Sequence, residues 1–363
     1  MRLLELWLRP YRNFASIHLC FEASHTLLFG PNGRGKSNIL EAISYLSIGK
    51  SVRGAKDAQS VPHSGEYFDI RGRFTSGGQA QKMRVFFGKK EGKKAFLNEN
   101  PLPRVADILG HFRTVHFSPE DVSLVLRFPA QRRRMLDILL SQSSSAYLRD
   151  LQIYQRVLQQ RNHLLRSAKK DPRSVPDAEV LESWDEQIVE HGSRIRRARL
   201  DALAVLQGPF TNYYGRFSPG GEEAEINYKG QRRKDAEDSL EQTLRDELQR
   251  KRAQELQMGH TLCGPHRDDL SFDLNGQPAE LYASEGQLKT ILISWKLAEC
   301  QFIAQRCDQQ PVVLLDDVFS ELDQARIGVL LEVVGEFGQV VITAPREFDT
   351  TPAATFEEIR LEK

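Results

Sequence analysis

The stretch that decides the fold is TLLFGPNGRGKSNILEAI, residues 26–43. Two glycines five positions apart, followed by Lys36 and Ser37, fit the phosphate-loop pattern G-x-x-x-x-G-K-[ST]. An apolar strand pattern precedes the loop. A helical pattern follows it, KSNILEAISYLSIG, with Gly49 as the expected C-cap. Strand, glycine-rich turn and helix in this order predict a binding site for nucleotide phosphates.

The composition of this loop suits the chemistry of a triphosphate. Its glycines let successive backbone N–H groups point inward around an anion, and the following helix adds the positive end of its dipole. We expect Lys36 to contact the β- and γ-phosphates and Ser37 to coordinate Mg²⁺. The expected ATP contacts are Gly30, Pro31, Asn32, Gly33, Arg34, Gly35, Lys36, Ser37 and Asn38.

A second segment, PVVLLDD at 311–317, is a short apolar run that ends in two aspartates. Such a run is typical of a central strand in a parallel sheet. We expect Asp316 to hold Mg²⁺ through water and Asp317 to polarise the attacking water. Buried strands often end in acids, so this pattern alone is weak. Together with the phosphate loop it indicates a nucleotide site. The expected catalytic residues are Lys36, Asp316 and Asp317.

A third segment, ASEGQLKT at 283–290, opens a helix with the turn Ser284-x-Gly286-Gln287. Backbone N–H groups and a serine hydroxyl at a helix start can bind phosphate. The phosphate loop already has that role toward the chain's own nucleotide, so a second phosphate-binding turn is useful toward a nucleotide held by another copy. This predicts an ATP-dependent homodimer with two nucleotides at its interface. The alternative is an ordinary capped helix.

Composition indicates a soluble globular protein of 363 residues, with 40% apolar and 27% charged residues. No apolar run reaches about 18 residues and the N-terminus does not resemble a signal peptide, so we expect a cytoplasmic protein without a membrane span. The net charge of +1 hides an asymmetry of +9 in 1–115, +2 in 116–255 and −10 in 256–363. A basic face would suit DNA; alternatively, the two ends neutralise each other in the fold.

The order of strand and helix patterns predicts an α/β fold with an inserted lobe. Residues 1–117 and 256–363 read as strands alternating with helices, and we expect them to form one discontinuous head with mixed and parallel sheet. Residues 118–255 read as an all-helical insertion that begins with SPEDVSLVL.

Three further features have no settled role in the sequence. His260, Cys263 and His266 are spaced like metal ligands, but a structural zinc site needs a fourth ligand and none is evident. AQRRRM at 130–135 suits either a DNA surface or an ordinary helix surface. For GPHRDDL at 264–270 we expect only a turn before a strand.

Taken together, these motifs resemble the ATP-binding-cassette ATPases of the chromosome-maintenance branch, and more closely the RecF family of bacterial recombination mediators. The resemblance includes YRNF at 11–14, the loop segment 30–54, SPEDVSLVLRFPAQRRRMLD at 118–137, GPHRDDL, ASEGQLKT and LLDDVFSELD at 314–323. It implies a contact to the second copy's nucleotide through Ser284, Gly286 and Gln287. It also implies that Asp323 communicates across the dimer and that Thr343 lies near the switch position.

Some positions depart from the pattern of cassette ATPases, or allow more than one reading. Most cassette ATPases have glutamate at the position of Asp317, and the shorter side chain of aspartate predicts slow turnover. VHFSPED at 115–121 stands where a glutamine-containing lid turn is expected, and ITAP at 342–345 stands where histidine is usual. Arg12 and Asn13 are candidates to touch the nucleotide from an edge strand and Arg53 to reach phosphate, although exposed arginines are usually only solvated.

The function implied by the resemblance is recombinational repair of gapped DNA. It implies sequence-nonspecific binding to junctions of single- and double-stranded DNA, RecO and RecR as partners in loading RecA, a place at the nucleoid and a link to the SOS response. Three alternatives remain from the residues: the nucleotide-binding subunit of a membrane transporter, a scaffold that binds nucleotide without hydrolysis, and a small-molecule kinase. A small-molecule kinase would not explain the ASEGQ turn.

Overall fold

The computed structural model describes residues 1–118, 128–170, 178–230, 239–345 and 356–361. The chain forms two compact units. The first comprises Met1–Leu124, Pro209–Glu223 and Ala283–Lys363, and the second comprises Val125–Gly208 and Ala224–Tyr282. Within the described ranges, no helix is long and apolar enough to cross a membrane.

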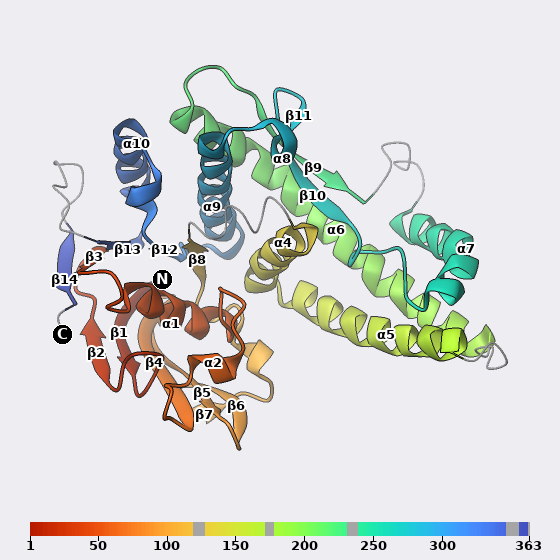
Figure 1. Cartoon of the computed structure of the whole chain (residues 1–363), viewed down its shortest axis with the longest axis horizontal. Helices are drawn as coiled ribbons and strands as arrows, with labels where there is room; N and C mark the ends of the chain where they lie inside the picture. The colour runs from red at the N-terminus through yellow and green to blue at the C-terminus, as the bar shows by residue number, and fades with distance from the viewer. Residues whose placement is uncertain (119–127, 171–177, 231–238, 346–355, 362–363) are drawn as a thin grey trace. The chain divides into compact units, whose positions relative to one another are not determined.

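The first unit contains two sheets (Figure 1). The six-stranded sheet is antiparallel and has the order β2-β1-β4-β5-β6-β7. Its strands are β1 Arg2–Leu8, β2 Ile17–Cys20, β4 Tyr67–Ser76, β5 Gln79–Gly88, β6 Gly92–Leu97 and β7 Asn100–Pro101. The five-stranded sheet is parallel, as the alternation of strands and helices predicted, with the order β14-β3-β13-β12-β8. Its strands are β3 His25–Phe29, β8 Thr114–Phe117, β12 Val312–Leu315, β13 Gln339–Ala344 and β14 Glu357–Arg360.

Helix α1, Lys36–Ile48, contacts strands of both sheets. Its Ile39, Leu40 and Ile43 are buried in one hydrophobic core with Leu6 of the antiparallel sheet and Leu314 of the parallel sheet. Gly49 ends the helix in the left-handed conformation, which confirms the predicted C-cap. The phosphate loop thus begins a helix that is fixed by packing on both sides.

The remaining elements of the first unit are short helices and two longer ones. They are α2 Asp57–Ser60, the 3₁₀ helix Val105–Ile108, α9 Glu285–Cys307, the 3₁₀ helix Val318–Glu321 and α10 Gln324–Val334. The expected helix SPEDVSLVL lies, beyond Ser118, outside the described residues, and so do residues 119–121 of the expected lid turn.

The second unit is built mainly from helices but is not all-helical. Its helices are α4 Pro129–Ser143, α5 Ser145–Lys170, most of α6 Ala178–Phe217, α7 Leu240–Met258 and α8 Ala279–Tyr282. A three-stranded antiparallel sheet accompanies them, in the order β11-β10-β9. Its strands are β9 Ala224–Lys229, β10 Asp269–Leu274 and β11 Gln277–Pro278.

The units therefore differ from the predicted domain boundaries of 117 and 256. Residues 256–282, expected in the head, belong to the second unit because β10 pairs with β9 over six residues, from Asp269↔Lys229 to Leu274↔Ala224. Residues 209–223, expected in the insertion, belong to the first unit. There Arg216 forms ion pairs with Glu332 and Glu336 around α10.

The second unit contains buried arginines, and these give GPHRDDL a structural role. Arg196 is 1% exposed and donates two hydrogen bonds to Asp268, at 2.8 and 2.9 Å. Arg132 of AQRRRM is 3% exposed and pairs with Asp269 at 2.8 Å. The two aspartates of GPHRDDL are thus acceptors for buried guanidinium groups. Arg132 is consequently part of the interior and not of a DNA-binding surface.

The candidate metal-ligand triplet has other contacts in the structure. His266 Nδ1 is 2.7 Å from the Tyr154 hydroxyl, and burial lowers the pKa of His266 to about 4. Burial also raises the pKa of the Cys263 thiol to about 12. His260 hydrogen-bonds the Met258 carbonyl. The side chains of this segment therefore serve packing and hydrogen bonding within the second unit.

Candidate nucleotide site

The phosphate loop connects β3 to α1, as the sequence predicts. Lys36 is 8% exposed and its Nζ donates to the carbonyls of Gly30 at 2.5 Å and Pro31 at 3.2 Å. Burial lowers the pKa of Lys36, whereas the nearby charges of Asp317 and Asp316 act in the opposite direction. The ammonium group is thus held under the loop, within the electrostatic influence of both predicted acids.

Gly35 shows why this loop requires glycine. Its φ of +94° lies in the left-handed region, and a Cβ atom there would lie 2.6 Å from Phe14 Cζ and 2.7 Å from the Asn13 side chain. Asn13 donates to the carbonyl of Arg34 at 3.2 Å and accepts from Asn38 at 2.8 Å. The YRNF turn therefore supports the phosphate loop from outside, through the hydrogen bonds of Asn13 to Arg34 and Asn38.

Asp316 is the centre of a hydrogen-bond network at the end of β12. Its Oδ1 accepts from the hydroxyls of Ser37 and Thr343, each at 2.8 Å, and its Oδ2 pairs with Arg53 at 3.0 Å. Thr343 Oγ1 also accepts from the backbone N–H of Asp317 at 2.8 Å. The parallel pairing of β12 with β13 places these groups at one sheet edge. Four residues that are far apart in sequence thus meet beside the phosphate loop.

These residues fit a bound magnesium ion. Mg²⁺ prefers oxygen ligands and usually keeps several waters, with one or two protein groups and the substrate phosphates completing its shell. The Ser37 hydroxyl and the Asp316 carboxylate supply such oxygens 2.8 Å apart, and Asp316 is 3% exposed. Arg53, which the sequence offered for phosphate, instead neutralises this carboxylate.

Arg12 and Asn13 were expected on an edge strand. In the structure, both lie in the turn after β1. The Arg12 guanidinium pairs with Glu41 of α1 through two hydrogen bonds, at 2.7 and 2.8 Å. Glu41 is fully buried and also accepts from the Ser51 hydroxyl. Sequence reasoning did not identify Glu41, since a single acid inside a helical pattern carries no distinguishing signal.

The turn at Ser284 is exposed at the start of α9. Ser284 Oγ accepts from the N–H of Gln287 at 3.3 Å, while Gln287 Oε1 accepts from the N–H of Ser284 at 2.7 Å. This reciprocal arrangement is a capping box. Among the described residues, no hydrogen bond or ion pair joins this turn to residues 30–38. We call Ser284–Gln287 the signature turn.

The signature turn has close neighbours at the start of α10. A Cβ atom at Gly286 would lie 3.3 Å from Arg326 Nη1. Arg326 pairs with Asp323 at 3.2 Å, and Asp323 caps α10 by accepting from the N–H of Arg326 at 2.9 Å. Ser284, Gly286 and Asp323, which the sequence assigned to the dimer contact, therefore belong to one surface region.

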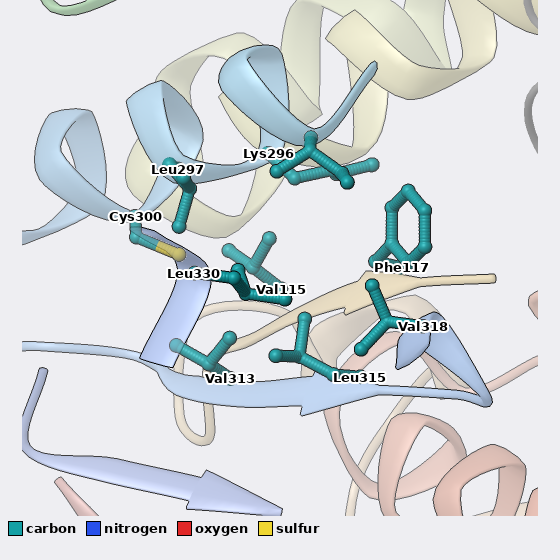
Figure 2. Close-up of a pocket in the computed structure, with 10 residues that line it drawn as sticks. Val115, Phe117, Lys296, Leu297, Cys300, Val313, Leu315, Val318 and Leu330 are labelled. Carbon is teal, nitrogen blue, oxygen red and sulfur yellow. The ribbon is translucent and has the colours of Figure 1, made fainter. Parts of the chain in front are cut away.

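Helix α9 links the signature turn to the strand that carries Asp316. Figure 2 shows Leu297 and Cys300 of this helix facing Val115 of β8 and Val313 of β12 across a small apolar hollow. Other apolar lining residues are Phe117, Ile293, Leu315, Val318 and Leu330. Because these side chains are closely packed, we expect a displacement of α9 to move β12 and hence Asp316.

Comparison with known proteins agrees with this architecture. The RecF/RecN/SMC N-terminal domain family matches residues 2–362. The DNA replication and repair protein RecF of Salinibacter ruber is 38% identical over 98% of this chain and 88% of its own length. RecF of Heliobacterium modesticaldum is 40% identical, over 94% of this chain and 92% of its own. The chain belongs to the RecF family.

Solved structures of the family extend this result. One described as the recombination mediator protein RecF with ATP in the RecFOR pathway superposes with a TM-score of 0.89 at 33% identity, covering 96% of this chain and 93% of that one. An Smc head domain superposes with a TM-score of 0.55 at 16% identity, which shows a shared fold. The fold is thus the expected ATP-binding-cassette head with an inserted lobe.

Proposed function

We propose that this protein is an ATPase of recombinational DNA repair that dimerises on ATP and binds DNA without sequence preference. The observation that carries the proposal is the contact of Ser37, Asp316 and Thr343 beside a glycine-rich phosphate loop. The ATP in a solved family member at 33% identity supports the same ligand here. Bound Mg²⁺ would neutralise phosphate charge and position the γ-phosphate.

The residues of the chain would then act as follows. Lys36 would give up its hydrogen bonds to the loop carbonyls and contact the β- and γ-phosphates. Ser37 and Asp316 would hold Mg²⁺ directly or through water. Asp317 orients the attacking water. Its short side chain reaches less far toward that water than glutamate would, which favours slow hydrolysis. Arg53 must release Asp316 Oδ2 if that oxygen is to serve the ion.

Dimerisation would complete the site in trans. The signature turn is exposed, begins a helix and offers N–H groups and a hydroxyl, which suits the γ-phosphate of a nucleotide held by a second copy. ATP would then stabilise the dimer and hydrolysis would release it. DNA gaps and junctions, RecO and RecR are proposed as partners from the family, and the excess of basic residues in 1–115 supports a polyanionic ligand.

Sizing of variants by light scattering tests the proposal. Asp317→Asn should keep ATP binding while blocking hydrolysis, so saturating Mg²⁺–ATP should double its apparent mass. The same variant carrying Ser284→Arg should stay a monomer, because a bulky cation replaces the capping hydroxyl. If the Asp317→Asn variant stays monomeric in saturating Mg²⁺–ATP, both with and without DNA, the proposed ATP-dependent dimer is wrong.

Two further measurements separate the alternatives. ATP turnover by the unmodified protein that disappears in Asp317→Ala would exclude a scaffold without hydrolysis. DNA affinity should fall steeply with salt concentration, since phosphate contacts release counterions. Affinity that does not depend on salt would contradict binding through the DNA backbone.

A further inference from the structure

Glu222, which follows α6, accepts hydrogen bonds from two segments of the first unit. Its Oε2 accepts from the Tyr214 hydroxyl at 2.8 Å and the Ser218 hydroxyl at 2.6 Å, both near the end of α6. Its Oε1 accepts from Gln287 Nε2 at 2.5 Å. The Ser218 hydrogen bond is the main cause that lowers the pKa of Glu222, so the carboxylate is charged at neutral pH.

The contact with Glu222 fixes the orientation of the Gln287 amide. Gln287 Oε1 accepts from the N–H of Ser284, while its Nε2 donates to Glu222. A flipped amide would place two donors together at Ser284 and two acceptors together at Glu222. Position 287 therefore needs one acceptor and one donor in this order. Glutamate, which is equally suited to a capping box, would instead place a second carboxylate against Glu222.

Arg326 joins this arrangement to the Asp323 turn. Its positive charge contributes to the lowered pKa of Glu222, and its Nη1 lies close to the position of a Cβ at Gly286. The same guanidinium pairs with Asp323. Glu222 is therefore an acidic group that contacts the signature turn and interacts electrostatically with Arg326 beside the Asp323 turn.

We propose that Glu222 is a positioning residue, which holds the signature turn through Gln287 in the conformation that receives a second copy's nucleotide. The inference rests on the proposed ATP-dependent dimer. Glu222 has no contact with the phosphate loop among the described hydrogen bonds, so it acts on dimer formation and leaves the binding of ATP to a single copy unchanged. The end of α6 takes part, because Tyr214 and Ser218 hold the same carboxylate.

The test measures the dimer dissociation constant in saturating Mg²⁺–ATP, with Asp317→Asn as the parent. Glu222→Ala and Gln287→Glu should each weaken the dimer about tenfold, the size expected for loss of a charge-assisted hydrogen bond. Binding of a fluorescent ATP analogue at protein concentrations that keep the chain monomeric should stay within about twofold of the parent. Glu332→Gln, at an exposed glutamate paired with Arg216, is the matched control and should change neither value.

The reciprocal double variant is decisive. Gln287→Glu combined with Glu222→Gln restores a carboxylate that accepts from Ser284 N–H and an amide that donates to it, so the dimer should return to within about threefold of the parent. An unchanged dimer in Glu222→Ala, or no rescue in a double variant with a normal melting temperature, would overturn the role of Glu222. A parent that does not dimerise would instead overturn the proposed function, and this role with it.

Discussion

Replacing Asp268 with alanine removes an acceptor that several buried donors share. The carboxylate is 4% exposed and accepts from Arg196 Nε and Nη2, at 2.8 and 2.9 Å, and from the Tyr228 hydroxyl at 2.7 Å. In the variant, Glu247 at 2.9 Å is the carboxylate that the buried guanidinium keeps within the described part of the chain. Removing one partner of a buried ion pair costs about 3–5 kcal/mol. We therefore expect the free energy of unfolding of the second unit to fall by about 4 kcal/mol.

Urea unfolding with pulsed hydrogen exchange and mass spectrometry can follow peptides of α6 between residues 185 and 205, so that it reports on the second unit alone. Glu247→Ala is the matched control. Its side chain is 21% exposed, and its loss leaves Arg196 both bonds to Asp268, so the cost should be about 1 kcal/mol. A loss in Asp268→Ala below about 1 kcal/mol, or equal losses in the two variants, would refute the assignment of GPHRDDL to the buried network.

Three other predictions concern the nucleotide site and the pH dependence of stability. Gly35→Ala should abolish ATP binding measured by calorimetry and lower the melting temperature, because its Cβ would collide with Phe14 and Asn13 at a left-handed φ; retained affinity would contradict this. Asp317→Glu should raise steady-state turnover about tenfold, because the longer side chain reaches the attacking water; equal or slower turnover would count against that role. The pKa of His266 is lowered to about 4, so unfolded chains bind its proton first as pH falls below about 6.5. This should cost about 2 kcal/mol at pH 5, and His266→Gln should flatten the loss in urea titrations at pH 5 and 7.

Local patterns predicted the elements around the nucleotide. The helix after the phosphate loop, its C-cap at Gly49 and the buried strand before Asp316 were all evident, because each depends on neighbours within a few residues. The parallel sheet followed from alternating strands and helices. The domain boundaries did not follow, because the pairing of β10 with β9 joins segments separated by 39 residues between Lys229 and Asp269.

The sequence by itself determined the phosphate loop, the acidic strand end and the capped signature turn, since each is a contiguous motif whose chemistry is local. Only the tertiary structure decided which side chains meet there. It brought Thr343 and Arg53 to Asp316, Glu41 to Arg12 and Glu222 to Gln287. These partners come from different strands, helices and loops. No spacing along the chain distinguishes an acid that positions a functional group from one that is only solvated.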